Sequence, residues 1–116
     1  MRFVFIVLFL LPGIAKAQTA EEWIRLGEQV HGGFGTLIPL GIRIGLDARE
    51  RLKAAPRELD VGFMGEALIK HRKTGEQLRY RIPAAAYGQI LQWNKGTTPA
   101  ERFKLVMEAP APFTVE

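Results

Sequence analysis

The hydrophobic positions between His31 and Leu52 repeat at steps of three and four residues, after a loop dense in glycine. This spacing predicts a helix that begins near Thr36 and buries one side, because residues three and four apart stack along one face of a helix. The apolar positions of that side are Leu37, Leu40, Ile44 and Ala48. The rest of the chain can be arranged around this helix.

Two glycines, Gly41 and Gly45, lie one turn apart inside the predicted helix. Each costs about 1 kcal/mol relative to alanine in a helix interior. A neighbouring backbone that approaches closely would explain why two glycines are tolerated here. Gly41→Leu is therefore predicted to destabilise the fold by overpacking. Asp47 and Arg51 are spaced to form an ion pair on the outer side.

An earlier helix is predicted from Ala20 to Val30. Thr19 and Glu22 have the spacing of a capping box, in which each side chain accepts a hydrogen bond from an otherwise unpaired amide. The glycines after His31 are typical of a helix end. The face predicted to be buried consists of Trp23, Leu26, Gly27 and Val30.

The second half of the chain changes to a two-residue period. A strand is predicted around Val61, and residues 67–72 and 77–82 are predicted to form a hairpin around Gly75. A short helix is predicted from Pro83 to Trp93. Residues 98–101 have the features of a further helix start, but the alternation of Phe103, Leu105 and Met107 instead predicts a strand over 102–108.

Together these elements predict an α+β fold, with helices packed on one face of a small, largely antiparallel sheet. Residues 18–116 suit a single small domain, because a chain of this length can bury one core. Residues 1–17 have the features of a signal peptide: a basic start, a short apolar run and Ala15-Lys16-Ala17 before the expected cleavage site. An uncleaved anchor is the alternative, but the apolar run is shorter than the roughly 18 residues of a spanning helix.

Cleavage changes the charge of the protein. The whole sequence has 16 Lys and Arg against 12 Asp and Glu, a net charge of +4. Loss of Arg2 and Lys16 leaves 14 against 12, or +2. A nucleic-acid partner is therefore not expected. The sequence predicts a secreted, periplasmic protein with no membrane span after cleavage.

The sequence contains no cysteine. Disulfides, thiolate metal sites, thiol redox chemistry and a cysteine nucleophile are thereby excluded. Neither histidine lies in a triad, zinc-protease or paired-carboxylate motif. No catalytic residue and no cofactor is predicted, and the composition favours a role other than catalysis.

The stretch that begins at His31 resembles the family of formylmethanofuran dehydrogenase E subunits. The family motif reads His-Gly-His-x-Cys-Pro-Gly-Leu-Ala-Leu-Gly-x-Arg, and five of its positions are matched here in register, at His31, Gly32, Leu40, Gly41 and Arg43. The resemblance implies the scaffold of that family. Its second histidine and its cysteine, plausible metal ligands, are replaced by Gly33 and Gly35. Because glycine has no side chain to coordinate a metal, the family's metal chemistry is not expected.

The candidate ligand-binding residues lie in and after this loop: His31, Gly32, Gly33, Gly35 and Arg43. Exposed amides at a helix start can bind an anion, although a tight connection between two helices is the simpler interpretation. His31 is either a residual ligand or a residue that interacts with the helix dipole. His71, expected to be solvated, is the other weak metal candidate.

Four aromatic residues could either line a pocket or belong to the core: Trp23, Trp93, Tyr80 and Tyr87. The sequence predicts a non-enzymatic binding or accessory module with an unidentified protein or small-molecule partner. The alternative is a metal-dependent or redox-accessory protein that uses His31 together with ligands from a partner chain.

Overall fold

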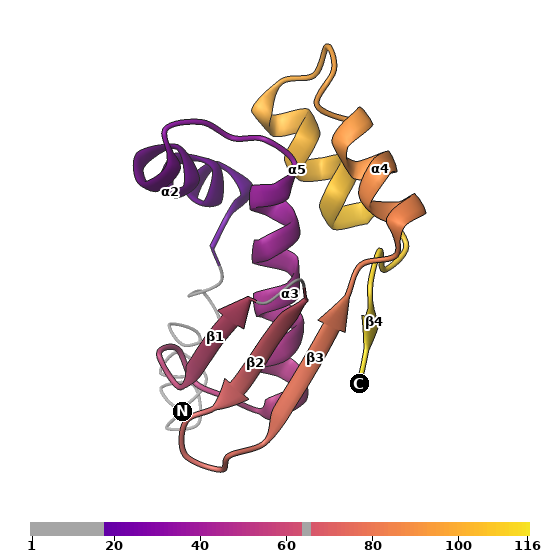
Figure 1. Cartoon of the computed structure of the whole chain (residues 1–116). Coiled ribbons are helices and arrows are strands. Elements are labelled where there is room, and N and C mark those ends of the chain that lie inside the picture. The colour runs from indigo at the N-terminus through magenta and orange to yellow at the C-terminus, as the bar shows by residue number, and fades with distance from the viewer. Residues whose placement is uncertain (1–17, 64–65) are drawn as a thin grey trace, which may run out of the picture.

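The computed structural model describes residues 18–63 and 66–116; the predicted signal peptide at 1–17 lies outside this range. The structure confirms the α+β class, with helices and a four-stranded antiparallel sheet in the order β1-β2-β3-β4 (Figure 1). Within the described ranges, no helix combines the length and apolar character needed to cross a membrane. The elements are α2 (Ala20–His31), α3 (Leu37–Leu52), β1 (Leu59–Phe63), β2 (Ala67–His71), β3 (Gln77–Arg81), α4 (Ala84–Gln92), α5 (Pro99–Glu108) and β4 (Thr114–Val115).

The core lies between α3 and the sheet, and α3 runs along one face of the strands (Figure 1). The predicted inner side of α3 is confirmed at Leu40, Ile44 and Ala48, which are all buried. Leu37 departs from the prediction, because 45% of its surface is exposed. The other buried hydrophobic residues of this cluster are Leu52, Ala67, Ile69, Tyr80, Ile90, Val106 and Phe113.

The hairpin of β2 and β3 also confirms the sequence pattern. Ile69 pairs with Leu78, and Gly75 in the turn has a φ of 81°, which glycine adopts without a steric cost. On the other side of β2, Val61 of β1 pairs with Ile69. Tyr80, which is fully buried, alternates with the exposed Arg81 along β3.

The predicted ion pair of α3 belongs to a larger cluster. Arg51 Nε lies 2.6 Å from Asp47 Oδ2, and the Tyr80 hydroxyl donates to the same oxygen at 2.6 Å. Burial of the phenol and its hydrogen bond to Asp47 raise the pKa of Tyr80 well above its ordinary value. Asp47 therefore joins α3 to β3 through Tyr80, in addition to forming the predicted ion pair with Arg51.

The strand predicted over residues 102–108 is wrong, because the structure has helix α5 there. Thr98 and Glu101 form a capping box, and Pro99 occupies the first helical turn. These signals specify a helix start by satisfying the unpaired amides, whereas the alternation of Phe103, Leu105 and Met107 is coincidental. Val106, which lies out of phase with that alternation, is the buried residue of α5.

The predicted buried face of α2 is wrong at Leu26 and Val30, which are exposed, while Trp23 and Gly27 are half-buried. The capping box of Thr19 and Glu22 is confirmed, and Gly32 ends the helix with a φ of 89°. However, α2 has no buried residue, and Val30 is 80% exposed. The helix packs against the Phe34 ring at Gly27. A Cβ atom at this position would lie only 2.9 Å from the ring.

Close approach therefore occurs at Gly27, and the prediction for Gly41 and Gly45 is wrong. In the described part of the chain, no atom outside the helix lies within 4 Å of the position that a Cβ would take at either residue. Periodicity placed these glycines beside the inner side of α3, but it could not show that the sheet does not reach them. A larger side chain at Gly41 has open space.

Candidate functional site

The glycine loop is a packed connection rather than an open site. The Thr36 amide, at the start of α3, donates to Asn94 Oδ1 at 2.9 Å, and the buried Thr36 hydroxyl donates to the Ile90 carbonyl at 2.7 Å. A Cβ at Gly35 would lie 3.5 Å from the same Asn94 oxygen. The first amide that an anion would use is therefore already paired with a side chain that follows α4.

Arg102 of α5 holds the loop from the other side. Its guanidinium donates to the carbonyl of Phe34 at 3.1 Å, to the carbonyl of Asn94 at 3.1 Å and to the Thr97 hydroxyl at 2.9 Å. Gly32 ends α2, and no described residue other than the chain neighbours lies within 4 Å of a Cβ at Gly32 or Gly33. These glycines do not line a common ligand-binding cavity.

Arg43 is bound to the end of α5. Its Nη1 atom donates to the carbonyls of Val106 and Ala109, both at 2.7 Å. The guanidinium carbon also lies 5.8 Å from the centre of the Phe113 ring. Because the last carbonyls of a helix lack internal partners, Arg43 serves as a cap for α5, and its hydrogen bonds do not go to the glycine loop.

The two histidines are separated. His31 is exposed at the end of α2, whereas the turn after β2, which follows His71, lies at the opposite end of the molecule from the α2–α3 loop (Figure 1). His71 is not solvated as expected: it is 4% exposed, and its Nδ1 accepts from the amides of Lys73 at 3.0 Å and Thr74 at 3.3 Å.

His71 thus shapes the hairpin turn, and its Nε2 atom lies 3.6 Å from Glu58 Oε1. Among the described residues, no group of three or more histidine, aspartate or glutamate side chains is placed to hold a metal ion.

An apolar groove lies between α3 and the sheet. Its volume is about 430 Å³, and none of the described residues that line it is charged. Several of its residues are accessible: Leu37 is 45% exposed, Val61 is 70% exposed and Tyr87 is 41% exposed. The lining comes from α3, β1, β2 and the start of α4, and consists of Leu37, Leu40, Gly41, Ile44, Gly45, Val61, Ala67, Ile69, Ile82 and Tyr87.

The two glycines of α3 create this groove. Gly41 and Gly45 flank the buried side of the helix and present only backbone to the groove. Across from them, Val61 lies beyond the part of the sheet that α3 covers. The sequence pattern does not reveal the groove, because a glycine pair has the same pattern whether the space beside it is filled or open. The expectation that aromatic residues line a pocket is met by Tyr87 in this groove and by Trp93 in a second hollow, while Tyr80 is in the core.

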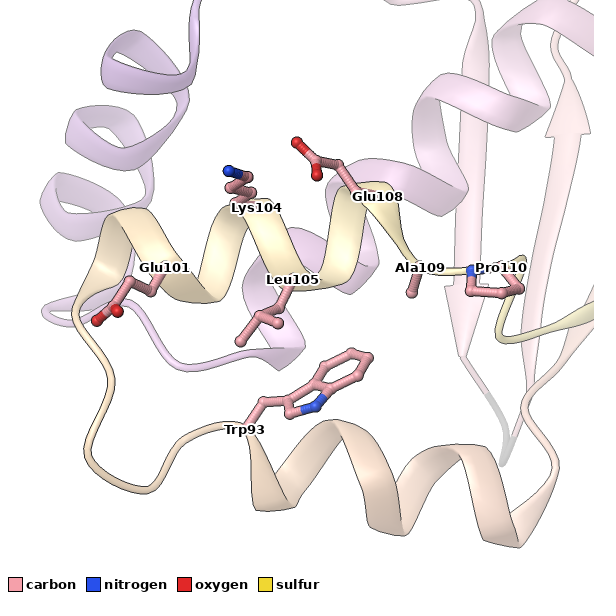
Figure 2. Close-up of a pocket in the computed structure, with 7 residues that line it drawn as sticks. All are labelled: Trp93, Glu101, Lys104, Leu105, Glu108, Ala109 and Pro110. Carbon is pink, nitrogen blue, oxygen red and sulfur yellow. The ribbon is translucent and has the colours of Figure 1, made fainter.

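A second hollow, of about 600 Å³, lies between α4 and α5. Figure 2 shows Leu105 directed toward the Trp93 indole, while Lys104 and Glu108 point to the other side of α5. The Glu101 carboxylate is already engaged by the Thr98 amide at 2.8 Å. The polar groups of this hollow therefore do not converge on a ligand, and the α3–sheet groove is the better candidate site.

Known proteins give no guide to the site. A scan against protein-family models gives no match, and neither the curated proteins nor the solved structures include one with significant similarity to this chain.

Proposed function

We propose that the protein is a non-enzymatic binding module that takes an apolar chain, or an apolar side chain of a partner, into the groove between α3 and the sheet. The observation that carries the proposal is the groove itself. It is uncharged, accessible and opened by Gly41 and Gly45, which are poor residues for a helix interior. A helix with two such residues beside an open apolar surface is well suited to admit a ligand.

The size of the groove suits a modest ligand. Its volume of about 430 Å³ falls within the range of about 300–1,000 Å³ that is typical of small-molecule sites. Each methylene that leaves water contributes about 0.8 kcal/mol, so about six buried methylenes supply about 5 kcal/mol before the cost of immobilising the ligand. Within the described part of the lining, only Tyr87 has a polar side-chain atom, so recognition in the groove depends mainly on shape and apolar contact.

Two predictions from the sequence belong to the same proposal. Residues 1–17 are proposed to direct export, so the protein works outside the cytoplasm and begins at Gln18. The scaffold is proposed to be similar to that of the formylmethanofuran dehydrogenase family, without its metal site. Intact mass of the exported protein tests the first point. The zinc, copper and nickel content of the same sample tests the alternative metal-accessory role of His31.

The proposed groove is tested with N-phenyl-1-naphthylamine, an apolar dye that fluoresces when it leaves water. We expect the wild-type protein to bind the dye and Gly41→Leu to bind it at least about tenfold more weakly, which corresponds to 1.4 kcal/mol. The leucine fills the groove and also raises stability by up to about 1 kcal/mol, because it is the better helix former. Loss of dye binding is then not a sign of unfolding.

Gly88→Leu is the matched control. Gly88 lies inside α4, has open space around it and does not line the groove. This variant should gain similar stability and bind the dye like the wild type. The proposal is wrong if the wild type does not bind the dye, or if Gly41→Leu and Gly88→Leu bind it equally well.

A further inference from the structure

Among the described residues, nothing pairs with the outer edge of β1. The Arg72 amide donates to the Glu58 carbonyl at 2.7 Å, so these two residues form a hydrogen-bonded pair of the β1–β2 ladder. Because hydrogen-bonded and non-hydrogen-bonded pairs alternate in an antiparallel ladder, Asp60 and Gly62 also bond to β2. The N–H and C=O groups of Leu59, Val61 and Phe63 therefore point to the edge, where the sheet of the described residues ends.

The central side chain of β1, Val61, does not protect this edge. Val61 is 70% exposed, although it lies on the same face as the buried Ile69 with which it pairs. Natural edge strands are commonly protected by lysine, proline or a bulge. β1 has the sequence Leu-Asp-Val-Gly-Phe, in which Asp60 is the one charged residue. A regular, five-residue edge with an exposed valine at its centre is a template for another strand.

We propose that β1 pairs antiparallel with β1 of a second copy of this chain, with Val61 at the two-fold axis. The backbone geometry allows this register, because the edge-facing groups of Val61 then bond with the same groups of Val61 in the other copy. Leu59 lies opposite Phe63 of the second copy, and Asp60 lies opposite Gly62. The strand is thus complementary to itself, as a two-fold interface requires.

The charges are compatible with this pairing. No like charges lie directly opposite each other, since each Asp60 faces a glycine. The two Asp60 residues are diagonal neighbours, about 7–8 Å apart. Arg72 Nε lies 3.5 Å from Asp60 Oδ1 and offsets its charge.

A second copy meets the backbone and charge requirements of this edge with the residues of β1 and Arg72 alone, whereas an unrelated peptide would need a matching sequence of its own. The pairing would also continue the sheet on the same face, so the exposed Val61 residues of both copies would meet beside their two grooves. The inference goes beyond the proposed binding function, because assembly and dye binding are measured separately and either can fail alone.

Light scattering coupled to size-exclusion chromatography, on protein purified from cells that express the full sequence, tests the assembly. Over about a hundredfold range of concentration, the wild type should have twice the chain mass at the high end and fall toward the chain mass on dilution. Val61→Lys should shift the mass to that of one chain, because two ammonium groups would face each other at the axis. Val30→Lys is the matched control: Val30 is 80% exposed on α2, and this variant should keep the double mass.

The register is tested by cysteine cross-linking, which is clean because the chain has no cysteine of its own. Val61→Cys should form a disulfide dimer under mild oxidation, since Cα atoms of a hydrogen-bonded pair lie about 5.5 Å apart, within disulfide range. Asp60→Cys should not, because the diagonal distance exceeds about 7 Å. This test does not depend on whether Val61→Lys folds.

Three results would overturn the proposal. One is a wild-type protein that has the mass of one chain at every concentration. This result would stand even if the mass increased when a different polypeptide was added. Another is a Val61→Lys variant that remains a dimer. The third is equal disulfide formation by Asp60→Cys and Val61→Cys.

Discussion

Replacement of Arg43 should show how strongly α5 depends on a residue of α3. Arg43→Met keeps the length and apolar stem of the side chain but removes both hydrogen bonds to the end of α5. The acceptors are the carbonyls of Val106 and Ala109, each 2.7 Å from Nη1. Val106 is fully buried, so its carbonyl cannot easily exchange the arginine for water.

The expected loss follows from these contacts. Hydrogen bonds to a charged group contribute about 1.5–3 kcal/mol each, but the two here share one donor nitrogen and are not additive. The contact with the Phe113 ring adds about 0.5–1 kcal/mol. We therefore expect Arg43→Met to lower the free energy of unfolding by about 2–4 kcal/mol. For a domain of about 100 residues, each kcal/mol lowers Tm by about 4–8 °C.

Urea denaturation followed by circular dichroism measures this change. Arg49→Met is the matched control, because Arg49 is an exposed residue of the same helix for which no ion pair is found among the described residues. It should change stability by less than about 0.5 kcal/mol. The cap interpretation is refuted if the two variants have the same stability. Arg43→Lys should recover only part of the loss. The lysine side chain is shorter, and its ammonium group is less suited to bridging two carbonyls.

Three further predictions test the contacts around the core. Thr98→Ala should lower stability by about 1 kcal/mol through loss of the α5 capping box, and an unchanged urea midpoint would contradict this. Thr36→Val should cost about 1 kcal/mol in the same assay, because the Ile90 carbonyl loses the Thr36 hydroxyl and keeps only the Trp93 amide, at 3.2 Å. The raised pKa of Tyr80 makes stability pH-dependent: its contribution is complete below the unfolded-state pKa of about 10 and is lost as pH rises above it. Unfolding midpoints should fall above that pH in the wild type and fall less in Tyr80→Phe.

The features that the sequence predicted are those that depend on nearby residues. The capping box of Thr19 with Glu22 and the turn glycine Gly75 are local devices, so they located α2 and the hairpin to within one residue. The error at α5 arose where two local signals disagreed. The cap at Thr98 was correct because it satisfies backbone amides, whereas an alternation of apolar residues has a direct energetic meaning only if a sheet is present to bury them.

The features that the sequence did not predict depend on distant residues. Arg43 is a candidate ligand residue in a helix pattern, and only the fold brings the carbonyls of α5 to it from 63 and 66 positions away. The groove is similar, because whether Gly41 faces a backbone or open space depends on how far α3 extends over β1. Periodicity indicates the direction in which a side chain points, but it does not indicate which element of the fold lies opposite that side chain.

The hydrogen bonds that hold α3 have a consequence for the order of folding. They join residues separated by 54 to 68 positions, and β3 completes its pairing only when Arg79 and Glu116 exchange hydrogen bonds. Closing such long loops is costly in chain entropy before the contacts form. During synthesis, α3 therefore emerges long before its partners and cannot be fixed in place until α5 and β4 have been made.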